Sequence, residues 1–189
     1  MSLKKNEMRE RCLSSRDIFE GRLLKVRIDE VELPNGGKTT REIVEHHTAV
    51  SVLALTDDGN VLLVRQFRYA VGEETLEICA GLVESGEKPE EAAVREMREE
   101  LGVRPAELSE VGRFYASPGF CTELLILYLA RGLSPSRLAQ DEDENVCSLE
   151  ARCEDIPDML ANGAFRDSKT FAAMAWLMAW KGLKPKCRE

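Results

Sequence analysis

The stretch that decides the fold is GLVESGEKPEEAAVREMREELGV, residues 81–103. Residues 89–101 predict an α-helix, because Pro89 suits the first helical position and the acidic residues that follow it favour the helix dipole. Gly102 can take the left-handed conformation that ends a helix. Residues 81–88 are expected to form a loop, whose glycines let the backbone approach a ligand closely.

Three glutamates of this helix point to one side. At about 100° per residue, Glu96, Glu99 and Glu100 share a sector roughly 100° wide, apart from the apolar face. Like charges at these spacings repel by a few tenths of a kcal/mol per pair. Either the face is simply solvated, or a divalent cation turns the repulsion into attraction. Carboxylate oxygens suit Mg²⁺ or Mn²⁺, which also bridge to phosphate oxygens. Arg95 flanks the same sector and can pair with a carboxylate.

Apolar runs on both sides of this unit predict a mixed sheet. Residues 22–44 alternate around a glycine-containing turn and predict a hairpin, and residues 48–55 and 60–67 predict a second one. The remaining expected elements are strands at 74–79, 108–115, 124–130 and 146–151, a short helix at 156–161 and an apolar helix at 169–180. Strands mixed with two substantial helices imply an α/β sandwich.

Composition and charge exclude several classes of protein. The length of 189 residues suits one compact domain, or one domain with a small appendage, and the formal net charge is −8. A negative charge disfavours nonspecific nucleic-acid binding, which needs a basic field. The six cysteines form no C-x-x-C pair and the two histidines are adjacent, so a structural zinc site is not expected. Free thiols indicate a reducing cytoplasm. The N-terminus lacks a signal-peptide core, and the longest apolar run, residues 171–180, is too short to span a bilayer.

The spacing of the fixed residues resembles a known motif. Residues 81–103 fit G-x5-E-x7-R-E-U-x-E-E-x-G-U, in which U is apolar, and this is the box of the Nudix family. Segments 64–69, 76–81, 117–120 and 167–170 resemble the ADP-ribose pyrophosphatase branch of that family. Members of this branch usually have proline where Cys79 stands.

The resemblance implies an architecture. The Nudix fold is a three-layer α/β/α sandwich with a mixed sheet, expected here over residues 45–189. A small N-terminal β-region, residues 1–44, is commonly exchanged between two subunits in this branch, so a homodimer is expected. The alternative is a monomer with an ordinary N-terminal sheet.

The resemblance also implies a metal centre and its support. The cofactor would be Mg²⁺, with Mn²⁺ as a substitute. The implied metal ligands are the backbone carbonyl of Ala80 and the side chains of Glu96, Glu99 and Glu100. Glu87 is expected to pair with Arg95 and, together with Gly81, to support the box.

A general base is expected within hydrogen-bond reach of the attacking water. In this branch it often comes from a loop distant from the box, and Glu144 in the acidic loop 141–144 is the predicted residue. Glu142 and Glu123 are alternatives, and a box glutamate, Glu99 or Glu100, could serve instead.

Substrate-binding residues are expected outside the box. Arg65 and Arg68 can match phosphate oxygens with a planar fork of donors, although strand alternation puts them on opposite faces. Gly119 lies in the proline-containing loop of the branch. The aromatic ring that stacks on adenine could be Phe19, Phe120 or Tyr69.

The resemblance implies hydrolysis of the pyrophosphate bond of a nucleoside diphosphate derivative, with ADP-ribose giving AMP and ribose 5-phosphate. Another nucleoside diphosphate sugar of the GDP-mannose type, or a dinucleotide, is the alternative substrate. A non-catalytic nucleotide-binding sensor is the alternative from another class, and the intact box argues against it. No nucleic-acid or membrane partner is expected.

Overall fold

The computed structural model describes residues 8–139 and 145–185. They form two compact units. The first contains the chain up to His47 together with Tyr115–Leu124, and the second contains Thr48–Phe114 and the chain from Leu125 onward. No helix in these two described stretches is long and apolar enough to cross a bilayer.

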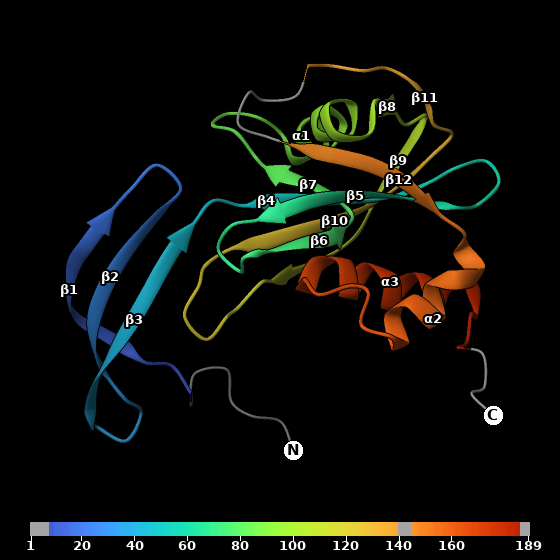
Figure 1. Ribbon diagram of the computed structural model, residues 1–189. Coiled ribbons are helices and arrows are strands. Elements are labelled where there is room, and N and C mark those ends of the chain that lie inside the picture. The colour runs from blue at the N-terminus through green and yellow to red at the C-terminus, as the bar shows by residue number, and fades with distance from the viewer. Residues whose placement is uncertain (1–7, 140–144, 186–189) are drawn as a thin grey trace. The chain divides into compact units, whose positions relative to one another are not determined.

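The first unit is built on a three-stranded antiparallel sheet, in the order β1 (Arg11–Glu20), β2 (Leu24–Glu32) and β3 (Lys38–His46) (Figure 1). The β2–β3 hairpin confirms the prediction for residues 22–44, and Gly36 adopts a positive φ of 83° in its turn. Strand β1 was not predicted. Its register shifts twice, and its residues are almost all exposed, so they carry no apolar–polar alternation.

A loop distant in sequence completes this unit. The Val44 N–H donates to the Phe120 carbonyl at 2.7 Å, and the Thr122 N–H donates to the Val44 carbonyl at 2.9 Å. The Thr122 hydroxyl accepts from the His46 N–H at 3.0 Å. The proline-containing loop therefore extends β3 rather than standing alone.

The second unit contains a seven-stranded mixed sheet, with β4 and β10 parallel. Its central path runs β12 (Val146–Ala151), β5 (Val61–Arg68), β4 (Ala49–Leu55), β10 (Leu124–Arg131) and β9 (Glu107–Tyr115).

Two short strands lie beside the paired part of β4 and β5. The last residues of β4 pair with the first residues of β5. The rest of β5 pairs with β6 (Glu73–Glu77), and the rest of β4 pairs with β7 (Cys79–Leu82). The chain crosses from one to the other at Ile78. The Ile78 N–H is satisfied by the Thr170 hydroxyl at 3.0 Å. The predicted single strand at 74–79 is therefore two strands, and the loop predicted to start at residue 81 starts after Leu82.

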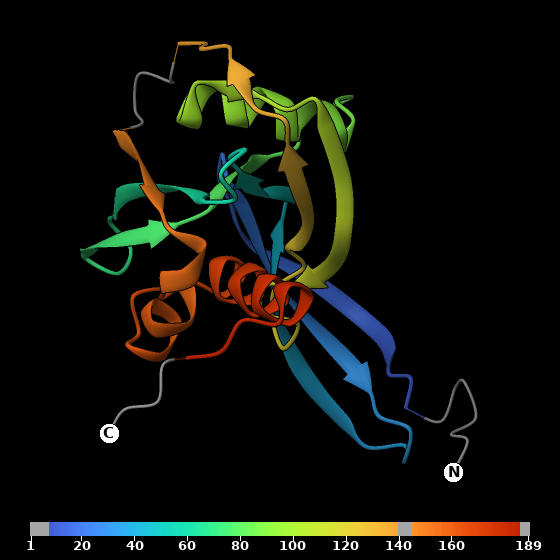
Figure 2. The same cartoon turned by 90° about the vertical axis from the view of Figure 1, so that its right-hand side faces the viewer.

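Helices cover both faces of this sheet and make three layers, as predicted (Figures 1 and 2). The box helix lies over one face, and α2 (Ile156–Ala161) and α3 (Ser168–Lys181) lie over the other. β4 is buried along its whole length because it contributes to the core on both sides. Val50 and Val52 pack in the core that contains Met97, and Leu53 and Leu55 pack in the core that contains Met174 and Leu177.

The box helix changes its winding. Residues Pro89–Glu96 form the α-helix α1, and Met97–Leu101 form a π-helical turn that ends at Gly102, φ 72°. The predicted ends are confirmed, but the predicted uniform 100° step is wrong over the last turn. π turns are rare and occur frequently at functional sites. Two short strands, β8 (Val103–Arg104) and β11 (Ser134–Pro135), pair beyond this turn, and a 3₁₀ turn, Cys153–Asp155, precedes α2.

Candidate active site

The box glutamates are not a solvated acidic face. Glu96 is 7% exposed and Glu100 is 3% exposed. The Glu99 side chain is also largely covered, at 17%. Burying carboxylates costs several kcal/mol unless cations or hydrogen bonds compensate the charge. The structure therefore needs a compensating group at each of them.

Arg95 is the compensating cation for two of these glutamates. Its Nη1 donates to Glu96 Oε1 at 2.7 Å and to Glu99 Oε2 at 3.1 Å. The predicted pair with Glu87 is present, with Nε to Oε1 at 3.0 Å and Nη2 to Oε2 at 3.1 Å. Nη2 also donates to the Leu82 carbonyl at 3.0 Å, which ties the helix to the end of β7. The hydrogen bond with Glu87 raises the pKa of Arg95, and the same bond lowers the pKa of Glu87.

Glu100 is held by the backbone of β7. The Ala80 N–H donates to Glu100 Oε2 at 3.1 Å. The neighbouring Cys79 thiol is fully buried, and burial together with the negative charge of Glu100 raises its pKa well above the ordinary value. The backbone whose carbonyl was predicted as a metal ligand thus directly contacts one of the predicted carboxylate ligands.

The Glu96 carboxylate lies against the backbone of Gly81, in space that a side chain at this position would fill. A Cβ atom on Gly81 would collide with both oxygens of that carboxylate. The first glycine of the box is therefore required by close approach of a side chain to the backbone, and not by a turn conformation.

Comparison with known proteins identifies the arrangement. A family model described as the NUDIX domain matches residues 45–174. The chain belongs to the Nudix family. A second model, described as the nucleoside diphosphate sugar hydrolase N-terminal domain, matches residues 10–44.

Relatives of this Nudix chain cover most of its length. It is 38% identical over 179 residues to an ADP-ribose pyrophosphatase of Bacillus subtilis (strain 168), covering 94% of this chain and 97% of that protein. A methanol dehydrogenase activator of Bacillus methanolicus shows the same identity and coverage. A GDP-mannose pyrophosphatase of Escherichia coli (strain K12) is 32% identical over 147 residues, which is 72% of this chain and 76% of that protein.

A solved structure supports the Nudix fold. A crystal structure of an ADP compounds hydrolase superposes with a TM-score of 0.84, covering 95% of this chain and 98% of the other at 24% identity. At this identity the likeness establishes the fold alone.

Nudix hydrolases need a divalent metal, and the donor set here fits one chemically. The predicted ligands are all hard oxygens, and the space at Gly81 is filled by a carboxylate rather than by an apolar side chain. Within residues 8–139 and 145–185, no three His, Cys, Asp or Glu side chains converge as a ready-made metal cage. Arg95 instead stands as the cation that bridges Glu96 and Glu99.

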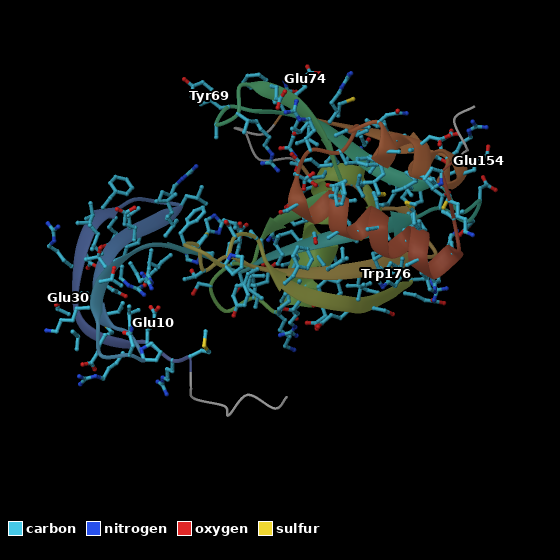
Figure 3. All side chains as sticks on the ribbon, turned by 90° about the horizontal axis from the view of Figure 1, so that it is seen from below. Glu10, Glu30, Tyr69, Glu74, Glu154 and Trp176 are labelled. Atoms are coloured by element: carbon cyan, nitrogen blue, oxygen red, sulfur yellow. The ribbon has the colours of Figure 1, made fainter. Side chains whose placement is uncertain are left out.

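The two predicted substrate-binding arginines have different surroundings. Arg65 is exposed, and its Nε lies 3.9 Å from Glu74 Oε2. Arg68 makes a two-pronged pair with the buried Glu77, with Nε to Oε1 at 2.8 Å and Nη2 to Oε2 at 2.7 Å. Tyr69, a predicted stacking residue, is 91% exposed and projects with Glu74 from the β5–β6 hairpin (Figure 3).

The other predicted residues fall elsewhere. Gly119, Phe120 and Phe19 belong to the first unit, and so does Glu123, whose Oε1 lies 3.8 Å from His46 Nδ1. Glu144 and Glu142, the predicted bases of the acidic loop, lie outside the described residues.

Sequence reasoning missed Glu77 and Lys169. Both are buried, and they form an ion pair with each other. A signal existed, because segment 167–170 places a lysine in the first turn of an otherwise apolar helix. Such a lysine needs a buried acceptor, but its partner, 92 positions earlier, could not be chosen from the sequence.

Proposed function

We propose that this Nudix hydrolase cleaves the pyrophosphate bond of ADP-ribose, with Mg²⁺ as its cofactor and Mn²⁺ as a substitute. Water adds at phosphorus, and the products are AMP and ribose 5-phosphate. The observation that carries the proposal is the set of buried box glutamates, Glu96, Glu99 and Glu100, supported by Arg95 and the backbone of β7.

The box residues have distinct tasks in this proposal. Glu96, Glu99 and Glu100, together with the Ala80 carbonyl, would hold the metal. When bound, the ion polarises phosphate oxygens and lowers the pKa of a water. Arg95 would hold Glu96 and Glu99 in place, because its guanidinium pairs with both carboxylates.

Other side chains would bind the substrate and move the proton. Arg68 would contact the diphosphate through the edge of its guanidinium that faces away from Glu77. Arg65, on the opposite face of β5, and Gly119 are the other predicted substrate-binding residues. Glu144 would take the proton from the attacking water, and Glu99 or Glu100 is the alternative base. Glu77 is not a candidate, because both of its oxygens already accept hydrogen bonds.

ADP-ribose is preferred because relatives named ADP-ribose pyrophosphatase match this chain well. The Bacillus subtilis protein is 38% identical, and one from Mycobacterium tuberculosis is 39% identical over 122 residues. The GDP-mannose pyrophosphatase of Escherichia coli, at 32%, makes GDP-mannose the second candidate substrate.

The N-terminal β-region would form a homodimer by exchange between subunits. The large apolar residues Ile18 and Phe19 of β1 are 48% and 55% exposed, and a second subunit that covered them would remove this apolar surface from water. We also propose that residues 1–44 and 45–189 are the functional divisions of the chain, since the two family models meet at this position. A cytoplasmic location is proposed from the cysteine content.

A substrate panel tests the proposal. The purified protein is incubated with Mg²⁺ and, separately, ADP-ribose, GDP-mannose, NADH and a diadenosine polyphosphate, and the products are separated by chromatography. AMP released fastest from ADP-ribose is the expected result. Faster release of GMP from GDP-mannose would move the chain to another substrate with the same chemistry. Tight ADP-ribose binding without turnover of any compound would leave a nucleotide-binding module.

A further inference from the structure

A buried charge network next to the box is not used by the proposed chemistry. Glu77, at the end of β6, is 1% exposed, yet four donor atoms converge on its carboxylate. Arg68 supplies two of them, the Thr75 hydroxyl donates to Oε1 at 2.6 Å, and Lys169 Nζ donates to Oε2.

These contacts keep Glu77 charged. Burial raises the pKa of Glu77, but the hydrogen bonds from Arg68, Lys169 and Thr75 and the charge of Lys169 outweigh burial and bring the pKa to about 2. Glu77 is therefore a fixed anion whose function lies in what it orients.

The side chain that it orients is Arg68. A guanidinium is planar, and a two-pronged contact through Nε and Nη2 fixes both its position and its plane. The Arg68 side chain is 45% exposed although Glu77 is 1% exposed, so the opposite edge faces outward. Within residues 8–139 and 145–185, no hydrogen-bond acceptor engages Arg68 Nη1. That edge presents donors in the fork that matches phosphate oxygens.

Arg68 also lies within the electrostatic reach of the box. The hydrogen bond with Glu77 is the main cause of its raised pKa, and the charges of Glu100 and Asp167 contribute as well. Strand β5, which ends at Arg68, also contacts the turn Met97–Leu101 that carries Glu99 and Glu100, so Arg68 and the box carboxylates belong to neighbouring elements of the same unit.

Helix α3 holds the network from the other side. Lys169 Nζ contacts Asp167 Oδ1 at 2.8 Å, and Asp167 caps the helix by accepting from the Thr170 N–H at 3.0 Å. The next contact, from the Ile78 N–H to Thr170 Oγ1, fixes the crossing between β6 and β7. Lys169, which contacts Glu77, is therefore itself held by the capped N-terminus of α3.

We infer that Glu77 is a positioning residue that aims the free edge of Arg68 at the substrate diphosphate, and that Lys169 holds Glu77 in place. This inference rests on the proposed function, since it takes the diphosphate as the group that Arg68 binds. It assigns a role to a charge network for which sequence reasoning gave none.

The test is a double-mutant cycle on binding, which does not depend on turnover. The dissociation constant of the α,β-methylene analogue of ADP-ribose is measured by calorimetry for the wild type, Glu77→Gln, Arg68→Ala and the double variant. Glu77→Gln replaces one acceptor oxygen by an amide that cannot accept from the fork, and is expected to weaken binding about tenfold or more. In the Arg68→Ala background, the same change is expected to alter the dissociation constant by less than about twofold.

Two further variants keep the test decisive. Thr75→Val is isosteric and removes one of the hydrogen bonds to Glu77, together with a 3.5 Å contact to the Gln66 carbonyl, so it gives a smaller effect of the same pattern if Glu77→Gln does not fold. Glu110→Gln breaks a matched two-pronged pair with Arg113, at 2.8 Å for both contacts, on the exposed surface of β9, and is expected to leave binding unchanged.

Each outcome decides something. Additive effects of Glu77→Gln and Arg68→Ala in an active enzyme overturn the inference and leave the proposed function intact. A non-additive cycle in a protein that binds the analogue but hydrolyses no pyrophosphate supports the inference and overturns the proposed reaction. A wild type that neither binds the analogue nor hydrolyses ADP-ribose overturns both.

Discussion

Replacing Gly81 by alanine should damage the proposed metal centre through a single methyl group. The Cβ would overlap the Glu96 carboxylate, and that carboxylate has little room to move because it is 7% exposed and bonded to Arg95 at 2.7 Å. Forcing a methyl group into a well-packed site costs about 1–3 kcal/mol. Displacing a metal-ligating carboxylate or its support weakens metal binding about 10–100-fold.

Two assays test this prediction. Urea denaturation gives the free energy of unfolding, and the initial rate of ADP-ribose hydrolysis against Mg²⁺ concentration gives the half-saturating metal concentration. Gly112→Ala is the matched control, because a Cβ at Gly112 has no atom within 4 Å. The reasoning is refuted if Gly81→Ala binds Mg²⁺ as tightly as Gly112→Ala does.

Three further predictions concern the supports of the site. Thr170→Val should lower the free energy of unfolding in urea by about 1–3 kcal/mol, because the Ile78 N–H loses its acceptor while shape is kept; an unchanged midpoint and slope would contradict this. Arg95→Lys should lower kcat/KM at least about tenfold, because a single ammonium cannot replace a planar fork; rescue by lysine in a steady-state assay would show that charge alone suffices. The pKa of Glu77 is about 2 in the folded protein against an ordinary 4.5, so its ionisation adds about 3 kcal/mol to the free energy of unfolding above pH 4.5, and this contribution is lost as the pH falls toward 2. The difference in unfolding free energy between the wild type and Glu77→Gln should therefore narrow from pH 4.5 to pH 2. A difference that stays constant over this range would rule the prediction out.

The sequence predicted the local features of the fold well. The box helix has a proline at its start and a glycine at its end, so both limits follow from chain chemistry alone. Strand β12 and helix α2 also occupy the predicted residues. The apolar residues of these segments recur at the spacing of a strand or a helix, so the local sequence is enough to predict the element.

Features that depend on distant contacts could not be predicted. The π turn at Met97–Leu101 uses residues that suit an α-helix equally well, so tertiary contacts decide its winding. Strand β1 carries mostly exposed residues and two register shifts, which remove its alternation. The break at Ile78 is stabilised by Thr170, far along the chain.

The candidate site divides in the same way. The motif predicted Glu96, Glu99 and Glu100 as one group and the Glu87–Arg95 pair, because their spacing is local, and the structure confirms the pair. The partner of Arg68 was not identifiable, because strand pairing and helix packing decide which carboxylate meets it.

The rate of AMP formation from ADP-ribose, measured against Mg²⁺ concentration for the wild type, Glu100→Gln and Glu110→Gln, tests the central claim most directly. Glu100 is buried at the box and bonded to the Ala80 N–H, whereas Glu110 lies on β9 and pairs with an exposed arginine. The structure predicts that Glu100→Gln loses about a hundredfold or more in rate at any given Mg²⁺ concentration, while Glu110→Gln matches the wild type. Equal rates and equal metal dependence for all three proteins would contradict the assignment of the box glutamates as the metal centre.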